Sequence, residues 1–229
     1  MDSGQAPGSV TVTARSLADY RNMFALDDAE LLAGPILDCP GGASSFAAEV
    51  GARGGQVVSV DPVYRLGAAH IADRVRVNLQ NARQIFAETT LPIEWDYLGS
   101  TETYVRASQV AATRFQADFT SNGSRYLAAL LPELPFADSS FELALVSHLL
   151  FVYDTHLSFA EHLSAILELV RVSPGGVRVH PVVESSGRQY GRMDDLRAAL
   201  GRLNVHTDIK PVTATWIAGA AQMLICRKR

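Results

Sequence analysis

The sequence predicts an α/β sandwich built around one mostly parallel β-sheet. Short apolar segments rich in β-branched residues alternate with helical segments, and turns containing Gly, Pro, Asp or Ser separate them. The chain has 229 residues, of which 48% are hydrophobic and 19% are charged, so it carries enough apolar surface for a single core. We therefore expect one domain, with right-handed crossovers between neighbouring parallel strands.

The first block of elements lies in the N-terminal quarter of the chain. Residues 1–15 are expected to be frayed, and a helix is expected within residues 17–33, with its start marked by Asp27 and Asp28. The segments that follow predict a strand over 35–38, a helix over 43–52 and a strand over 56–60. Together they predict one βαβ unit.

A second alternating block begins near residue 125. Within it, apolar residues recur at three- and four-residue steps, as one buried helix face requires, at Phe159, Leu163, Ile166, Leu167 and Val170. The expected elements are strands from 125 and over 141–147, a helix over 154–172, a strand over 177–183, a helix over 193–203, and two closing strands over 205–210 and 221–227.

About sixty residues separate the strand ending at Val60 from the strand near 125, far more than a simple crossover needs. Residues 65–124 are expected to contain helices over 66–89 and 104–121, joined by the aromatic residues Trp95, Tyr97 and Tyr104. Long insertions in small domains are often lids or binding elements, so we expect a helical cap over the site. The alternative is a helical pair that supports one sheet edge.

Charge and composition exclude several classes of protein. The formal net charge is −4, whereas nucleic-acid binding needs clustered cations, so we expect no nucleic-acid partner. The two cysteines, Cys39 and Cys226, form no disulfide framework and no zinc-type spacing. No segment predicts a signal peptide or a membrane span, so the protein is expected to be cytoplasmic and free of membranes. The sequence sets no oligomeric state.

The turn after the first strand predicts a ligand site. Asp38 stands at the strand end, Gly41 and Gly42 lie in the turn, and small residues open the next helix. Glycines remove the Cβ atoms that keep a ligand from the main chain, and a helix N-terminus leaves N–H groups available. Asp61 ends the next strand, twenty positions after Gly41, at the spacing from which a carboxylate binds a ribose diol. A ligand containing ribose is the leading hypothesis.

The glycine pattern separates two ribose ligands. A dinucleotide pyrophosphate needs G-x-G-x-x-G, but Phe46 stands where the third glycine is required, so a nicotinamide cofactor is disfavoured. S-Adenosylmethionine carries no phosphate and is cationic, so an acid at the position of Asp38 suits it. Tyr64, close after Asp61, either covers the ribose or packs under the cap.

Four segments in order resemble class I S-adenosylmethionine-dependent methyltransferases. They are the glycine turn 37–46, the ribose-site residues 60–62, the stretch 134–144 before the fourth strand and the stretch 169–176 before the fifth strand. The resemblance covers residues 35 to about 183, and it implies a Rossmann-like three-layer sandwich whose seven-stranded sheet has the order 3-2-1-4-5-7-6, with the last strand antiparallel.

Site residues follow from the resemblance by position. Asp38, Gly41 and Gly42 would line the methionine part of the cofactor, and Asp61 would bind the ribose. Pro40 and Ser44 depart from the family pattern, since they occupy positions often held by glycine.

The adenine site also departs from the family pattern. Where many relatives place an acidic residue for the adenine amino group, this chain has Leu130. Main-chain groups around Leu130 and Leu131 are therefore expected to bind the adenine, or Glu133 takes the acidic role.

The end of the fourth strand predicts the chemistry. Methyl transfer needs positioning of donor and acceptor, and a base only when the nucleophile arrives protonated. His148 is the candidate base, with a structural histidine as the alternative, and the adjacent Ser147 is assigned to the cofactor. His180 is expected to be packed, and His156 and His162 are expected on the surface. No residue pattern predicts a metal site.

The sequence therefore predicts an enzyme that moves a methyl group from S-adenosylmethionine to an oxygen, nitrogen or carbon atom of a small-molecule acceptor. Two alternatives stay open. One is a protein that binds the cofactor without transferring its methyl group, and the other is a nicotinamide-dependent oxidoreductase.

Overall fold

The strands form a single sheet at the centre of the molecule. The computed structural model describes residues 12–89, 91–213 and 216–228. The strands are β1 (Ile36–Asp38), β2 (Val57–Val60), β3 (Tyr126–Leu127), β4 (Leu143–Ser147), β5 (Val177–His180), β6 (Val205–Pro211) and β7 (Gln222–Lys228). Each strand coincides with a predicted one, but β5 ends three residues early, because Pro181 has no N–H to donate to a neighbouring strand.

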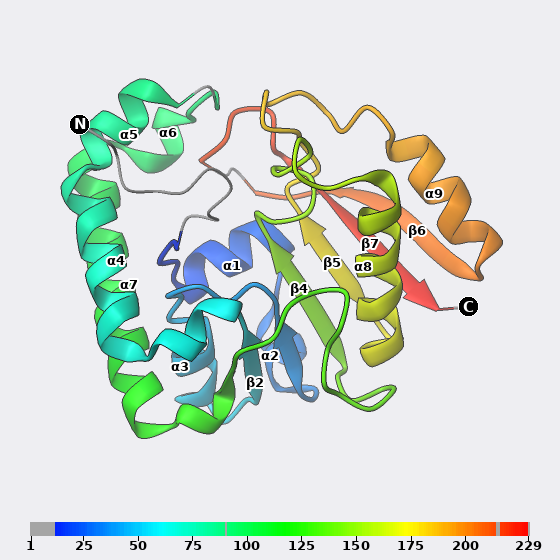
Figure 1. The fold of residues 1–229 in the computed structure, drawn as a ribbon, viewed down its shortest axis with the longest axis horizontal. Helices are drawn as coiled ribbons and strands as arrows, with labels where there is room; N and C mark the ends of the chain where they lie inside the picture. Colours follow the sequence, from blue (N-terminus) through cyan, green and yellow to red (C-terminus); the bar gives the residue numbers. More distant parts are fainter. Residues whose placement is uncertain (1–11, 90, 214–215, 229) are drawn as a thin grey trace.

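The sheet has the order β3-β2-β1-β4-β5-β7-β6 (Figure 1). Strands β3 to β5 pair in parallel, whereas β7 runs antiparallel to both β5 and β6. The predicted strand order and the antiparallel last strand are confirmed. In this order β2 and β4 lie on opposite sides of β1, so the strand order reverses direction at β1. Ligands of open α/β sheets bind beyond the carboxyl ends of the strands at such a switch point.

Helices cover both faces of the sheet. They are α1 (Leu17–Phe24), α2 (Asp28–Leu32), α3 (Phe46–Gly51), α4 (Ala68–Gln80), α5 (Ala82–Glu88), α6 (Trp95–Leu98), α7 (Thr101–Ser121), α8 (Phe159–Val172) and α9 (Met193–Arg202), with 3-10 turns η1 (Pro62–Leu66) and η2 (Gly123–Arg125). A helix does begin after Asp27, as predicted, but a separate helix precedes it. Capping boxes at Ser16, Asp27 and Ser158 start α1, α2 and α8.

Alternation along the strands divides the core into two layers. Leu143 and Leu145 of β4 face the layer that contains α1, α3 and α7, whereas Ala144 and Val146 face the layer that contains α8 and α9. This two-residue period is what a strand buried on both faces requires. The result is the predicted three-layer sandwich.

Residues 65–124 contribute α4 to α7, and α4 and α7 lie side by side at one end of the molecule (Figure 1). The ring of Tyr64 packs against Phe115, Phe119 and Tyr126, with ring centroids 5.4–6.0 Å apart. Tyr64 therefore packs under the inserted helices, which is the second of the two placements that the sequence left open.

The segment just before α1 differs from the prediction. Val12 and Ala14 are only 8% and 6% exposed and belong to the core, so residues 12–15 are not frayed. Residues 1–11 lie outside the described part of the chain. Long-range main-chain bonds, described below, hold this segment, and no local sequence pattern signals them.

Gly41 provides a test of how tightly the turn after β1 is packed. A Cβ atom at Gly41 would lie 2.7 Å from Cβ of Ser59 and still closer to the hydroxyl of Tyr64. Gly41→Ala should therefore lower the free energy of unfolding by about 1–3 kcal/mol, as overpacked cores do. Gly201→Ala is the control, because a Cβ there meets open space on α9 and should stabilise the helix. Urea denaturation of both variants measures the effect, and equal stabilities would contradict it.

Candidate active site

A cavity of about 540 Å³ opens at the carboxyl ends of β1, β2 and β4. It brings together five residues that the sequence assigned to the site, since Gly41, Gly42, Asp61, Ser147 and His148 all line it. Its volume lies within the range of about 300–1,000 Å³ that is usual for small-molecule sites. Parallel strands place these residues together because their carboxyl ends meet at one edge of the sheet.

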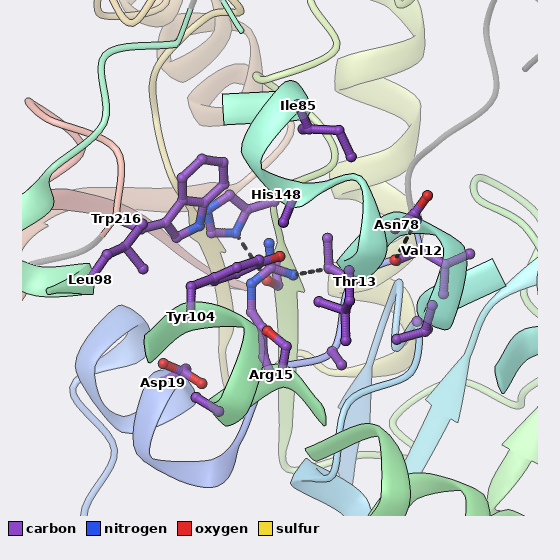
Figure 2. A pocket seen from close by; sticks show the side chains of 18 of the residues that line it. Val12, Thr13, Arg15, Asp19, Asn78, Ile85, Leu98, Tyr104, His148 and Trp216 are labelled. Atoms are coloured by element: carbon purple, nitrogen blue, oxygen red, sulfur yellow. Dashed lines mark hydrogen bonds between the residues drawn. The ribbon is translucent and has the colours of Figure 1, made fainter. Parts of the chain in front are cut away.

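The inserted helices supply the opposite wall of the cavity. Figure 2 shows Ile85, Leu98 and Tyr104 around the cavity, together with Trp216 from the loop before β7 and residues of the N-terminal segment. The lining residues from α4 to α7 are Val75, Asn78, Leu79, Ala82, Ile85, Phe86, Tyr97, Leu98, Thr103, Tyr104, Ala107 and Ser108. Most of them are apolar or aromatic, so this wall offers dispersion and stacking with few hydrogen bonds.

Residues 12–17, which we call the N-terminal segment, lie against the turn that follows β1. Main-chain N–H groups of Ala43 and Ser45 donate to the carbonyl oxygens of Thr13 (3.0 Å) and Arg15 (2.9 Å). Ser44 Oγ also donates to the Arg15 carbonyl, at 2.9 Å.

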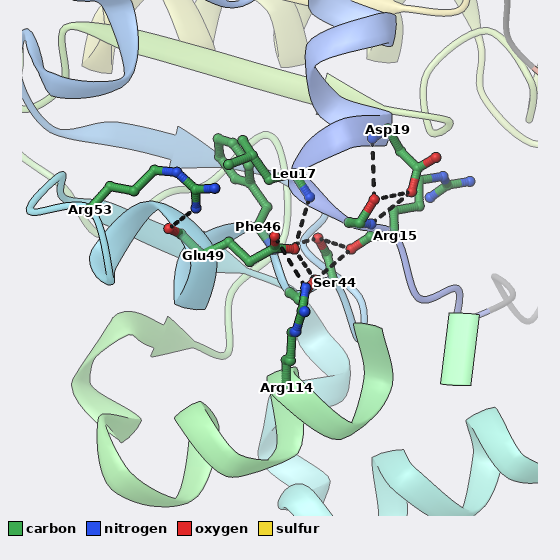
Figure 3. Close-up of polar contacts among 10 residues, drawn as sticks. Arg15, Leu17, Asp19, Ser44, Phe46, Glu49, Arg53 and Arg114 are labelled. Carbon is green, nitrogen blue, oxygen red and sulfur yellow. Dashed lines mark hydrogen bonds and ion pairs between the residues drawn. The ribbon is translucent and has the colours of Figure 1, made fainter. Parts of the chain in front are cut away.

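Glu49 of α3 reinforces this attachment (Figure 3). One of its carboxylate oxygens accepts hydrogen bonds from the Leu17 N–H (3.1 Å) and from Ser45 Oγ (2.6 Å). The other lies 3.3 Å from the Arg114 guanidinium of α7. Glu49 thus ties the N-terminal segment, the glycine turn and an inserted helix together.

This packing corrects one expectation about the turn. The N–H groups of residues 42–46 were expected to be available to a ligand, but every one of them donates to an acceptor within the protein. The acceptors include the carbonyls of Thr13 and Arg15 and the carboxylate of Asp61. A pyrophosphate would need these donors, so the turn does not fit a dinucleotide.

Asp61 stands at the rim of the cavity, after β2. Its Oδ2 accepts a hydrogen bond from the Gly42 N–H (3.0 Å), and its Oδ1 accepts one from the Val63 N–H (2.9 Å). Burial raises the pKa of the carboxyl, and these hydrogen bonds oppose the shift. Each oxygen keeps a further lone pair, so the carboxylate can accept additional hydrogen bonds from a ligand.

Asp38 differs from its predicted placement. It is fully buried and is not among the residues that line the cavity. Its carboxylate accepts hydrogen bonds from the Tyr20 hydroxyl (2.7 Å) and from Ser59 Oγ (3.0 Å). Burial raises its pKa to about 7, against the effect of both hydrogen bonds. Asp38 thus lies below the glycine turn, because its side chain points to the layer occupied by α1.

His148 lies at the end of β4 in left-handed backbone geometry, with φ +51°. It is 8% exposed, its Nδ1 lies 3.1 Å from Ser147 Oγ, and its Nε2 has no hydrogen-bond partner among the described residues. Burial lowers its pKa well below the usual value, and the positive charge of Arg15 adds to this shift. The imidazole is therefore neutral at physiological pH, and its unpaired Nε2 is itself buried although the residue lines the cavity.

The other histidines divide between packing and surface roles. His180 is buried and its Nε2 lies 2.9 Å from the Ala220 carbonyl oxygen, so the predicted packing role is confirmed. His156 is exposed, as predicted. His162 was expected on the surface but is fully buried, because its two ring nitrogens lie 2.8 and 2.9 Å from the carbonyl oxygens of Ser158 and Leu150.

The residues expected at an adenine site do not reach the cavity. Leu130 is 61% exposed, and its carbonyl oxygen accepts a hydrogen bond from the Glu133 N–H at 3.0 Å. Leu131 packs partly against the second layer of the core. Leu130, Leu131 and Glu133 do not line the cavity, since the chain turns back on itself between Leu130 and Glu133.

Sequence reasoning missed Arg15, Tyr104 and Trp216 as cavity residues. The ring of Trp216 stacks on that of His148, with centroids 5.4 Å apart and an interplanar angle of 14°. Arg15 was placed in a segment expected to be frayed. The only signal for Tyr104 was its place in the aromatic part of the insertion.

Three further findings concern the residues that the structure describes. Both cysteines are buried free thiols. No group of three or more His, Cys, Asp or Glu side chains within 12–89, 91–213 and 216–228 is arranged to hold a metal ion. In the same ranges, no helix combines the length and the apolar character that crossing a bilayer demands.

Comparison with known proteins confirms the fold. No protein-family model matches the chain. The uncharacterized protein MJ0045 of Methanocaldococcus jannaschii is 28% identical over 186 residues, which cover 80% of this chain and 82% of that protein.

Among solved structures, the pyocyanin biosynthetic protein PhzM aligns with a TM-score of 0.50 and 13% identity over 92% of this chain, which thus spans 54% of PhzM. Magnesium protoporphyrin IX methyltransferase from Synechocystis PCC 6803 aligns with a TM-score of 0.48 and 12% identity, over 88% of this chain and 73% of that one. Together with the strand order, the similarity to PhzM identifies the Rossmann-like fold of class I methyltransferases.

The buried carboxyl of Asp38 predicts a specific pH dependence of stability. Its pKa is about 7 in the folded protein and near 3.8 when unfolded, so the folded state binds more protons between these values. The contribution of Asp38 to the free energy of unfolding is therefore fully present below pH 3.8 and is lost as the pH rises to about 7. The loss is on the order of 4 kcal/mol, because each unit of difference between the two pKa values corresponds to about 1.4 kcal/mol.

Asp38→Asn cannot ionise, so its stability relative to the unmodified protein should rise steadily from about pH 4 to pH 7. His148 and His180 impose the opposite slope, but they are present in both proteins and cancel in the difference. Urea denaturation at several pH values measures this difference. Asp73→Asn on exposed α4 is the control, and a difference for Asp38→Asn that stays constant with pH would contradict the prediction.

Proposed function

We propose that this protein transfers a methyl group from S-adenosylmethionine to an oxygen, nitrogen or carbon atom of a small molecule bound in the cavity. One observation carries the proposal. The cavity brings together the double-glycine turn, Asp61 and His148, whose Nε2 has no hydrogen-bond partner among the described residues. Residues 65–124, whose helices line the opposite wall, act as the cap.

The residues at the turn fit this cofactor better than a dinucleotide. The Asp61 carboxylate has lone pairs left for a ribose diol. Gly41 and Gly42 line the cavity and carry no side chain, so a ligand at this wall meets main chain. The N–H groups of the turn are already used, which suits a ligand without phosphates. When bound, S-adenosylmethionine supplies an electrophilic methyl group on a positively charged sulfur.

We assign the remaining residues of the cofactor site by their position. Asp61 binds the ribose hydroxyls, and Gly41, Gly42 and Ser147 border the amino-acid tail. Asp38 acts from beneath the turn through its charge. Leu130 and Leu131 do not line the cavity, so we assign them no contact with the adenine.

His148 is suited to take a proton from the acceptor. Ser147 Oγ donates toward Sδ of Met23 at 3.8 Å, so its lone pairs are free to accept the proton of His148 Nδ1. This arrangement selects the tautomer in which Nε2 is unprotonated. Because its pKa is lowered, the ring stays neutral and Nε2 keeps its lone pair. A phenol, amine or hydroxyl acceptor can then donate its proton to Nε2. Because Nε2 is buried here, this transfer requires the ring to turn toward the cavity.

Asp61→Ala tests the cofactor site. Loss of charge-assisted hydrogen bonds, worth roughly 1.5–3 kcal/mol each, should weaken S-adenosylhomocysteine binding by about one to two orders of magnitude. Isothermal titration calorimetry measures the affinity. Asp73→Ala, an exposed carboxylate on α4, is the control and should bind as the unmodified protein does. Unchanged affinity in Asp61→Ala would remove this residue from the cofactor site.

His148→Asn tests the chemistry, with asparagine chosen because it tolerates the left-handed backbone. Turnover should fall by about 10²- to 10⁴-fold, while S-adenosylhomocysteine affinity changes less than about twofold. The acceptor comes from a screen of small phenols, amines and carboxylates for S-adenosylhomocysteine formation. His156→Asn on the surface is the control. Full turnover in His148→Asn would leave His148 a packing role, and cofactor binding without turnover on any acceptor would favour a non-methylating protein.

A further inference from the structure

Arg15 is the single Lys or Arg among the cavity-lining residues that the structure describes. Its Nη1 donates a hydrogen bond to Thr13 Oγ1 at 2.6 Å, and within the described ranges no carboxylate lies within ion-pair distance of its guanidinium. A guanidinium has five N–H donors in a planar fork. Most of these donors are therefore left for a ligand or water in the cavity.

The two carboxylates that line the cavity are already engaged elsewhere. Asp19 accepts hydrogen bonds from the N–H and the hydroxyl of Ser16, both at 2.8 Å, and from the Tyr97 hydroxyl at 3.2 Å. Asp61 accepts its hydrogen bonds from main-chain N–H groups of its own turn and of Gly42. Neither of them neutralises Arg15, so the positive charge of the guanidinium is offered to the cavity.

The charge of Arg15 acts near the ends of β4 and β5. It contributes to lowering the pKa of His148, His180 and also Asp38, whereas Arg74 acts on Asp61. Figure 2 shows Arg15 among Tyr104, His148 and the lining residues of the N-terminal segment. The guanidinium therefore lies beside His148 and Tyr104, at the end of the cavity that we assign to the acceptor.

Flat aromatic surfaces surround the same end. The indole of Trp216 lies nearly parallel to the imidazole of His148, and Tyr97, Tyr104 and Phe86 also line the cavity. Aromatic walls favour planar ligands, which stack with centroids about 4.5–7 Å apart. A cation beside such walls adds a partner for a negatively charged substituent.

We propose that the acceptor is a planar aromatic carboxylic acid whose carboxylate pairs with Arg15 and whose ring stacks among Trp216, Tyr104 and Tyr97. This inference rests on the proposed function and names the substrate class of the same site. Arg15 is then a specificity-determining residue. Because its main-chain carbonyl, and not its side chain, holds the turn after β1, its side chain can be replaced without loss of that packing.

The test uses a matched pair of probes that differ in charge and hardly in shape, 4-nitrobenzoate and 4-nitrobenzamide. Each is titrated by calorimetry into the full-length protein, with and without saturating S-adenosylhomocysteine. The unmodified protein should bind the acid about 10- to 100-fold more tightly than the amide, as expected for charge-assisted hydrogen bonds. Arg15→Gln should abolish this preference by weakening only the acid, and Arg15→Lys should retain part of it.

Two controls accompany the titrations. Arg202→Gln, an exposed arginine at the end of α9, should preserve the preference for the acid. In a Trp95→Phe background Trp216 is the sole tryptophan of the chain, so the nitro ring should quench its fluorescence if it binds against that indole. Thermal unfolding of each variant checks that it folds.

The outcomes separate this inference from the proposed function. An acid that binds no better than its amide, or fails to bind, overturns the inference, and so does an equal preference in Arg15→Gln. Arg15→Gln that loses S-adenosylhomocysteine affinity while keeping the acid preference would assign Arg15 to the carboxylate of the cofactor. Failure of the unmodified protein to bind S-adenosylhomocysteine would instead refute the proposed function, and the acid preference would still be measurable without it.

Discussion

The main-chain hydrogen bonds between the N-terminal segment and the turn after β1 are the interaction on which the site depends. The carbonyls of Thr13 and Arg15 accept the N–H groups of Ala43 and Ser45, and the Ser44 hydroxyl reaches the Arg15 carbonyl across 29 residues of sequence. These bonds shape three features together. They close the turn to phosphate groups, they build one wall of the cavity, and they direct the Arg15 side chain into it.

The charges around the cavity are distributed according to the ligand groups proposed for each side. Asp61 lines the cavity and Asp38 is buried below the glycine turn, so two carboxyl groups lie on the side that we propose for the cationic cofactor. Asp38 has a pKa of about 7, and a nearby cation favours its ionised form. Arg15 supplies the opposite charge beside the histidine. The proposed cationic donor and the proposed anionic acceptor would thus each lie beside a group of opposite charge.

The sequence predicted the elements whose signals are local. Glycines and β-branched runs located the strands, and capping residues located the start of α2. The family resemblance supplied the strand order, from which Asp61, Gly41 and His148 were expected at one edge of the sheet. Features that depend on distant partners could not be predicted. Arg15 is a cavity residue because its carbonyl meets Ser45, and His162 is buried because the Leu150 carbonyl lies beside its ring. Neither partner can be identified from spacing along the chain.

The inserted helices both line the cavity and pack against the rest of the fold, and α7 shows how. Tyr104, Ser108, Ala111 and Phe115 recur at steps of four, three and four residues, so they share one face of the helix. The first two line the cavity, whereas Ala111 and Phe115 belong to the core beside the sheet. The second half of α7 therefore holds the helix against the fold while the first half lines the cavity. Because these two halves of α7 are separate, substitutions near Tyr104 can alter the cavity wall while the core packing that positions α7 stays intact.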